Sequence, residues 1–290
     1  MLSGIAQNIF PYVGAWARHG VFIALASGDA AARGGLNDGD EAALFGVARV
    51  EVPPYGAVPR SSRITADAVD VMIEDETLVY RFPYHYPDRA HRGEMNADFL
   101  NPQRFLDRVA PVLDLFGERA RLVMLRPAPL YRTEEIAFEE ILERLDRFLA
   151  HLPAAYRYVL EPPAPMVLRR EYFDCLHARG VVHMFSEGEA LFRALPSVGE
   201  QLFIPGAVAP PFCVVRSGFP GEIPGMPHRR FDGALRRQGW YDAVCRCLVE
   251  HLPVYLFVDD GTNPLDSLMA LMEMLNEDLA KRSVLRQNAA

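Results

Sequence analysis

Carboxylates follow several apolar runs of this 290-residue sequence, at the positions where each run ends. Glu161 and Asp259 have this placement, and Glu51 is the last polar residue of the run 48–52. Acids held close together in a partly dry cleft can split their pKa values, so that one serves as a general acid and the other as a general base. We therefore expect Glu161 to act as acid or base and Glu51 to be its partner. Asp259 would orient the substrate or a metal ion.

Two arginines, Arg126 and Arg216, end apolar runs in the same way. A guanidinium can bind a carboxylate or a phosphate through two parallel hydrogen bonds. Arginines in the site of an acidic protein therefore favour a small anionic ligand. The same residues allow a structural alternative, in which acids and arginines pair with one another in a ring of ion pairs that resists substitution.

His85, Tyr55 and Trp240 complete the predicted site, as further residues that contact the substrate. His85 and His183, together with the carboxylates, are of the types that bind zinc, manganese or magnesium. No HxH or HExxH spacing supports a metal centre. The sequence therefore predicts no firm cofactor and leaves a divalent metal open.

Eight short apolar runs must position these residues. The runs expected as strands are 21–26, 48–52, 78–82, 121–125, 156–160, 181–185, 212–215 and 254–258. Apolar strands that alternate with helices are typical of a parallel sheet covered on both faces. Eight such units predict a closed (β/α)8 barrel of the α/β class, with its site at the C-terminal ends of the strands. A doubly wound open sheet is the alternative, although no GxGxxG or GxxxxGK[ST] motif follows a strand.

Helix boundaries can be predicted from turn and capping residues. Asn101-Pro102 predicts the start of a helix that ends at Gly117, because Asn is a good N-cap and Pro suits the first helical position. Residues 65–73 are expected to form a short helix.

The strand endings share an order with a known family. In that order the sequence has Phe45 before Val50-Glu51, then Phe82-Pro83-Tyr84-His85, Leu152-Pro153 before Val159-Leu160-Glu161, Val215-Arg216-Ser217-Gly218, and Tyr255 to Asp260. This order resembles the YecE-like family (domain of unknown function 72), from about Leu36 onward. The family has two amides in place of Asp259 and Asp260, and a His in the seventh ending that is absent here. The resemblance implies a TIM-barrel fold and no particular activity.

Composition limits the class of protein. Thirty Lys and Arg against 38 Asp and Glu give a net charge of −8 and a pI near 5.5, which argues against a broad nucleic-acid or anionic-membrane surface. Half of the residues are hydrophobic, enough for one large core, so we predict a single domain over residues 1–290 with 1–20 as an N-terminal extension. Four cysteines without a CxxC pair, and an N-terminus without a basic n-region, favour a cytoplasmic protein.

Two functions remain open from the sequence. The first is an enzyme, a hydrolase or isomerase of barrel type, that acts on a small polar or anionic, sugar- or phosphate-like molecule by general acid–base chemistry. The second is a non-catalytic binding or scaffold protein with a degenerate site, whose partner surface would be the Pro- and Gly-rich segment 205–227. The departures from the family at the strand endings favour the second.

Overall fold

Eight parallel strands form one sheet in the order β1-β8-β7-β6-β5-β4-β3-β2. The computed structural model describes residues 21–25, 47–52, 67–84, 86–130, 136–186, 196–219, 233–260 and 269–277. The strands are β1 (Val21–Leu25), β2 (Val47–Val52), β3 (Ala68–Ile73), β4 (Ala120–Leu125), β5 (Tyr158–Leu160), β6 (Val182–Ser186), β7 (Cys213–Phe219) and β8 (Val254–Asp260). From β2 to β8, neighbours in the sheet are also neighbours in the sequence, as repeated strand–helix units produce.

The first and last strands lie side by side. β1 pairs with β8 in parallel along all of its residues, from Val21 opposite Val254 to Leu25 opposite Val258. β1 and β2 stand at the two ends of the strand order, and no pair between them occurs among the strand pairs of the described residues. The structure therefore shows an α/β fold with a curved parallel sheet. An open sheet accommodates this order too, so full closure into a barrel stays a prediction.

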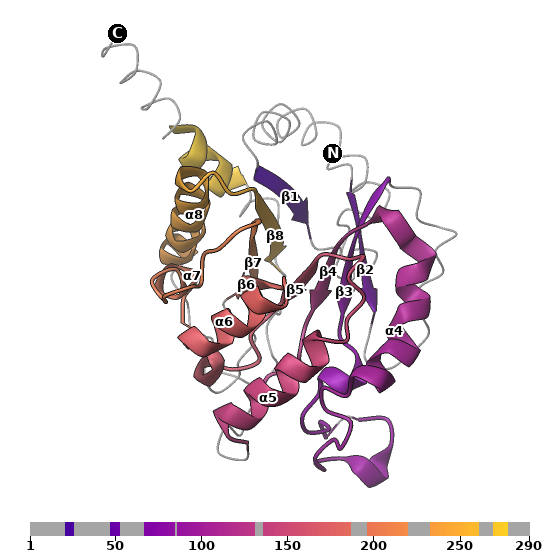
Figure 1. Ribbon diagram of the computed structural model, residues 1–290. Coiled ribbons are helices and arrows are strands. Elements are labelled where there is room, and N and C mark those ends of the chain that lie inside the picture. Colours follow the sequence, from indigo (N-terminus) through magenta and orange to yellow (C-terminus); the bar gives the residue numbers. More distant parts are fainter. Residues whose placement is uncertain are drawn as a thin grey trace, which may run out of the picture.

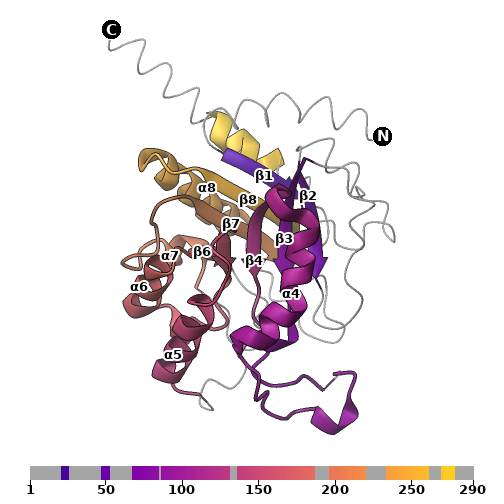
Figure 2. The same cartoon turned by 45° about the vertical axis from the view of Figure 1, so that its right-hand side comes forward.

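Helices cover the outside of the curved sheet (Figures 1 and 2). The structure contains α4 (Pro102–Phe116), α5 (Phe138–Leu149), α6 (Arg170–Ala178), α7 (Val198–Gln201) and α8 (Gly233–Val249), with short 3-10 turns η2 (Glu76–Leu78), η3 (Arg89–His91), η4 (Gly117–Arg119) and η6 (Pro165–Val167). Helix α5 shows why they pack there: Phe138, Ile141, Leu145 and Phe148 share one buried face at helical spacing. None of the described helices has the length and apolar character needed to cross a membrane.

Two separate hydrophobic clusters fill the two faces of the sheet. The larger lies between strands and helices and includes Val71, Phe105 and Phe148. The smaller comes from β3 to β8 and the residue before β7: Met72, Leu122, Met124, Val159, Val182, Met184, Phe212, Val214, Tyr255 and Phe257. Because strand side chains alternate between faces, this inner cluster is the opposite face of the same strands. Residues on the inside of a curved sheet can pack on one another in this way.

The third strand is a correction to the sequence prediction. Residues 68–73, expected as a helix, form β3, and the run 78–82, expected as the third strand, forms the last residue of η2 and irregular structure. β3 was not recognised in the sequence because a charged residue, Asp70, interrupts its apolar pattern. Asp70 is fully buried, and Arg121 Nε donates a hydrogen bond to its Oδ1 at 2.9 Å. Leu78, Tyr80 and Phe82 are buried as expected, but as core residues of a loop.

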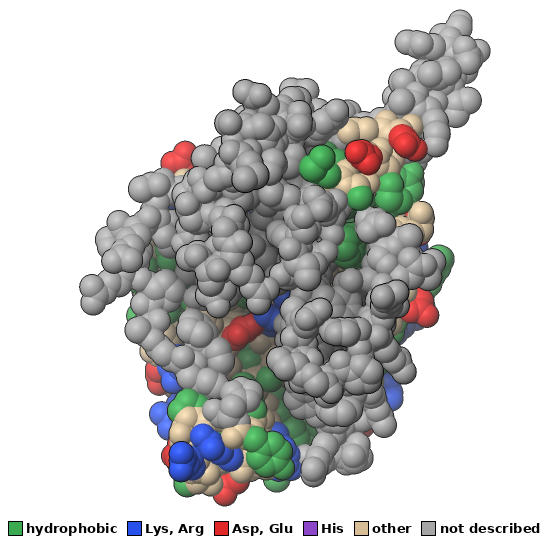
Figure 3. Space-filling view, turned by 180° about the vertical axis from the view of Figure 1, so that it is seen from behind, with side chains coloured by type: hydrophobic (Ala, Val, Ile, Leu, Met, Phe, Trp, Pro, Cys, Tyr) green, Lys and Arg blue, Asp and Glu red, His purple; other side chains and the backbone are tan. Residues whose placement is uncertain are grey.

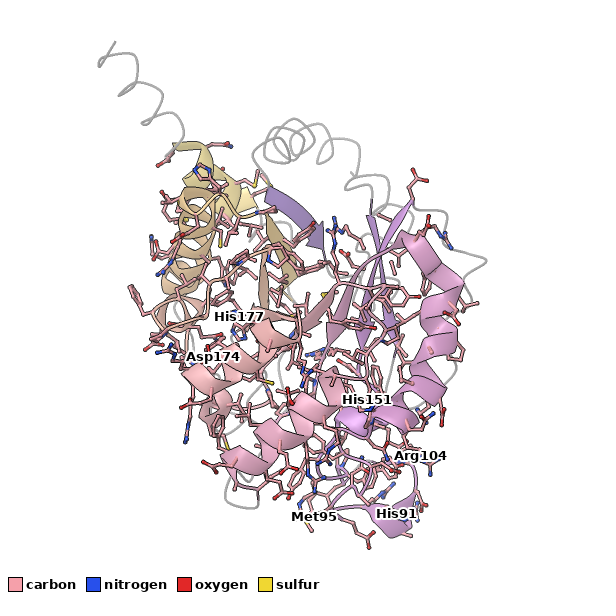
Figure 4. The ribbon with its side chains drawn as sticks, viewed as in Figure 1. His91, Met95, Arg104, His151, Asp174 and His177 are labelled. Atoms are coloured by element: carbon pink, nitrogen blue, oxygen red, sulfur yellow. The ribbon has the colours of Figure 1, made fainter. Side chains whose placement is uncertain are left out.

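The segment between β3 and α4 extends beyond the end of the sheet and carries His91 and Met95 on its distal part (Figure 4). Its two arms are joined by backbone hydrogen bonds, from Phe82 N to Glu94 O at 3.0 Å and from Gly93 N to Phe82 O at 2.9 Å. Phe82 stacks on Tyr86 with ring centroids 4.3 Å apart. The segment is therefore held by its own contacts as it leaves the C-terminal end of β3.

Removing the cap of α4 should destabilise the protein by about 1 kcal/mol. The Asn101 side chain accepts hydrogen bonds from Gln103 N at 3.1 Å and Arg104 N at 3.3 Å, which confirms the predicted cap. Asn101→Ala leaves both amides without this acceptor, whereas Asn101→Ser keeps an acceptor; both variants lose the hydrogen bond that Asn101 donates to Asp98 at 2.9 Å. Urea denaturation measures the difference. Equal stability of the Ala and Ser variants would show that the cap contributes nothing.

Candidate functional site

Four charged side chains meet where β3, β4, β5 and β7 approach their C-terminal ends. Glu74, Arg126 and Glu161 directly follow β3, β4 and β5, and Arg216 lies within β7. We call these four residues the mouth cluster. Three continue the backbone ladder one step past the strands: Glu74 N donates to Val52 O at 3.0 Å, Arg126 N to Ile73 O at 2.9 Å, and Glu161 N to Leu125 O at 3.0 Å. The sheet therefore fixes the backbone positions of these three residues.

Glu161 is the centre of the mouth cluster. Arg216 Nη1 donates to its Oε1 at 3.0 Å, and Arg126 Nε lies 3.3 Å from its Oε2. On its other side, Arg126 Nη1 donates to Glu74 Oε1. The cluster is thus a chain of four charges of alternating sign, from Glu74 through Arg126 and Glu161 to Arg216. The sum of the four charges is zero.

Exposure falls steadily along this chain of charges. The side chains of Glu74, Arg126, Glu161 and Arg216 are 37%, 18%, 7% and 5% exposed. Figure 3 shows an acidic and a basic side chain in contact at the centre of the face opposite to that of Figure 1. A molecule that arrives from solvent would meet the Glu74–Arg126 end first.

The pKa of the Glu161 carboxyl is lowered. Burial alone would raise it, but the positive charges of Arg216 and Arg126 outweigh burial. Ser186 is buried and ends β6, opposite Arg216 in the register of β7. Glu161 is therefore a carboxylate at neutral pH. It can accept a hydrogen bond or a proton, but it holds no proton to donate.

The structure brings together three of the predicted site residues, Arg126, Glu161 and Arg216. It places Trp240 elsewhere, buried in α8 within the cluster between the sheet and the helices. Glu51 and Asp259 belong to β2 and β8, but their side chains lie outside the described part of the structure, and so do His85 and Tyr55. The roles given to these residues remain predictions.

His183 faces away from the mouth cluster. Its Nε2 donates to Gln201 Oε1 at 3.1 Å, because the amide nitrogen of Gln201 is already bonded to the carbonyls of Ser186 and Pro196. The Tyr172 hydroxyl donates to Nδ1 at 3.4 Å. Burial lowers the pKa of His183 to about 4, against the Gln201 hydrogen bond and the Glu161 charge, which raise it. It is a neutral core histidine with both ring nitrogens bonded.

Sequence reasoning missed two members of this environment, Glu74 and Ser186. Glu74 was hidden because β3 was expected to be a helix, so no strand end fell on it. Ser186 directly follows the sixth expected strand, but its hydroxyl is uncharged, so nothing in the sequence marked it as a member of the site.

Among the described residues, no group of three or more His, Cys, Asp or Glu is arranged to hold a metal ion.

Some solved structures are similar to this chain. No family model and no curated protein matches this sequence. The crystal structure of a DUF72 family protein from Thermotoga maritima is similar to this chain, with a TM-score of 0.48 and 11% sequence identity over 88% of this chain and 98% of that chain. It belongs to the family that the strand endings resemble. This chain is an α/β protein with a curved parallel sheet. It has a cluster of four charged residues near the C-terminal ends of its strands.

Proposed function

We propose that the mouth cluster binds a small polar or anionic molecule and that the protein is an enzyme which uses the Glu161 carboxylate beside it. The observation that supports this most is the position of Arg126. It lies between two carboxylates and is partly exposed, whereas Arg216 behind it is buried. A partly exposed guanidinium that already binds carboxylates is suited to bind the carboxylate or phosphate of a ligand.

The lowered pKa of Glu161 refines its proposed role. A carboxylate that is ionised at neutral pH cannot serve as a general acid, and two arginine charges make it a weak base. Glu161 would therefore accept hydrogen bonds from the ligand, stabilise a positive charge that develops on it, or take a proton once Arg126 has turned to the substrate. The acid partner would be another group, and Glu51 remains the proposed candidate, with Asp259 as the group that orients the substrate or a metal ion.

A closed (β/α)8 barrel is part of this proposal. Glu74 N is bonded to Val52 O at the end of β2, so the end of β2 adjoins the mouth cluster. Pairing of β1 with β2 would complete a ring in which Glu51 and Asp259 also face the ligand. The structural alternative, in which the ion pairs only hold the sheet closed, accounts for the same contacts. Ligand binding separates the two.

Arg126→Gln should weaken ligand binding about 10- to 100-fold, because a hydrogen bond to a charged group contributes roughly 1.5 to 3 kcal/mol. The measurement is a thermal-shift screen of wild type and variant against sugar phosphates, small carboxylates and divalent metals. Ligand at 100 times its dissociation constant stabilises the folded state by about 2.7 kcal/mol, so a true ligand is visible.

Arg144→Gln is the matched control. Arg144 pairs with Glu140 on the exposed face of α5 at 2.8 Å, outside the mouth cluster, and the substitution removes the same charge. A ligand that binds wild type and Arg144→Gln equally, but binds Arg126→Gln weakly, supports the proposal. Equal binding by Arg126→Gln would contradict it and leave the ion pairs as structural elements.

A further inference from the structure

The two carboxylates bound to Arg126 are not equivalent. Glu161 is buried and is also held by Arg216, so it cannot leave without exposing a second charge to an apolar interior. Glu74 is the most exposed member of the mouth cluster, at 37% of its side chain. A partly exposed ion pair contributes little to stability, typically below about 1 kcal/mol. Of these two carboxylates beside Arg126, Glu74 is the easier to exchange.

Glu74 can release Arg126 without movement of the sheet. Its backbone amide is fixed to Val52 O, and the carbonyl of the preceding residue, Ile73, accepts from Arg126 N. The side chain beyond this fixed backbone has three rotatable bonds, and part of its surface faces solvent. A change of rotamer can therefore move the Glu74 carboxylate away from Arg126 Nη1.

We propose that the Glu74 carboxylate occupies the place of the ligand on Arg126, and that the ligand is a small organic acid whose own carboxylate displaces it. This inference rests on the proposed function of the mouth cluster. A carboxylate is the group for which the outer side of Arg126 is already arranged. The exchange also keeps a carboxylate beside this guanidinium nitrogen, since that of the ligand takes the place of the Glu74 carboxylate.

Glu74 therefore acts as an internal competitor. Substitution of Glu74 should therefore raise the affinity for the ligand, whereas substitution of Arg126 should lower it, although both residues belong to the same ion pair. If the pair were only structural, loss of either partner would disturb the site in the same direction. The sign of the Glu74 effect is the feature that a structural role does not produce.

The test measures binding of acetate, succinate and citrate by isothermal titration calorimetry, with inorganic phosphate as the comparison anion. Glu74→Ala should bind the best of these carboxylates about two- to fivefold more tightly than wild type, as the loss of a partly exposed competing ion pair predicts. Glu74→Gln, which keeps the shape but not the charge, should shift the affinity in the same direction. Arg126→Lys and Arg126→Gln should both weaken it.

Glu140→Ala is the matched control, since it removes one negative charge from an exposed ion pair on α5. An equal gain in affinity in Glu140→Ala would show that net charge alone is responsible and would overturn the inference. So would an unchanged or weaker affinity in Glu74→Ala, while loss of binding in Arg126→Gln would still uphold the proposed function. Tighter binding of phosphate than of every carboxylate would overturn the assignment of the ligand class. Absence of binding by wild type and by Glu74→Ala, to every probe, would remove the proposed function as well.

Discussion

Glu161→Ala should lower the free energy of unfolding by about 3 to 5 kcal/mol, the largest effect that we expect from any single substitution in the mouth cluster. Arg216 is 5% exposed and donates to Glu161 at 3.0 Å. Loss of the Glu161 carboxylate leaves the positive charge of Arg216 buried without this partner. The free energy of unfolding falls by the cost of burying that charge. Urea denaturation at neutral pH gives the value.

The double variant Glu161→Leu with Arg216→Met provides the control. Replacing both members of a buried ion pair by apolar side chains of similar size is often neutral or stabilising, so most of the loss should be recovered. A double variant as unstable as Glu161→Ala would show that the packing of Glu161, and not its charge, accounts for the effect.

The protein should also lose stability at acidic pH because of Glu161. Its folded-state pKa is lowered relative to the unfolded state, so its contribution is complete above the ordinary glutamate pKa of about 4.3 and is lost as the pH falls through the lowered value. This loss belongs to the most acidic part of the stability profile. It should be absent in the double variant.

His183 should make the protein about 3 kcal/mol less stable at pH 4 than at pH 7. Its pKa is lowered to about 4 by burial, whereas in the unfolded chain it titrates near 6.5. Between pH 4 and pH 6.5, His183 is mostly protonated in the unfolded state and mostly neutral in the folded state. The contribution of the neutral histidine is therefore complete above about pH 6.5 and is lost as the pH falls toward 4.

The measurement is the free energy of unfolding at a series of pH values for wild type, His183→Leu and His177→Asn. His183→Leu should be less stable at pH 7, because Gln201 and Tyr172 lose a partner, but its stability should change less between pH 6.5 and 4. His177 is exposed on α6 (Figure 4), so His177→Asn should keep the wild-type profile. Parallel profiles for wild type and His183→Leu would refute the assignment.

Strand ends could be predicted from the sequence wherever a strand was apolar along its length. Arg126 and Glu161 were found because each follows an uninterrupted apolar run, and parallel strands bring their C-terminal ends to one edge of a sheet. β3 could not be found in this way. Asp70 interrupts its apolar pattern, and the partner that makes the charge tolerable, Arg121, lies 51 residues further along the chain. With β3 unrecognised, Glu74 had no reason to be placed at the site.

Contacts between distant residues set the other limit of the prediction. The sequence presented Arg126 and Arg216 either as ligand-binding groups or as partners of the acids, and it offered no means to see that both contact Glu161. The pKa of Glu161 depends on those contacts, so its expected role as acid or base could not be decided from residue types. His183 likewise differs from an exposed histidine only through neighbours on α6 and α7.

The mouth cluster has a consequence for biosynthesis, because its spatial order is also its sequence order. Glu74, Arg126, Glu161 and Arg216 follow one another along the chain and run from the most exposed to the most buried. A ribosome therefore supplies the outer charges first, and Arg216 emerges 55 residues after the carboxylate it neutralises. Until Arg216 is synthesised, the Glu161 carboxylate is more stable in water than in the interior of the protein, because burial of a charge without a partner is costly. The innermost arginine thus arrives last, and its arrival makes burial of the Glu161 carboxylate favourable.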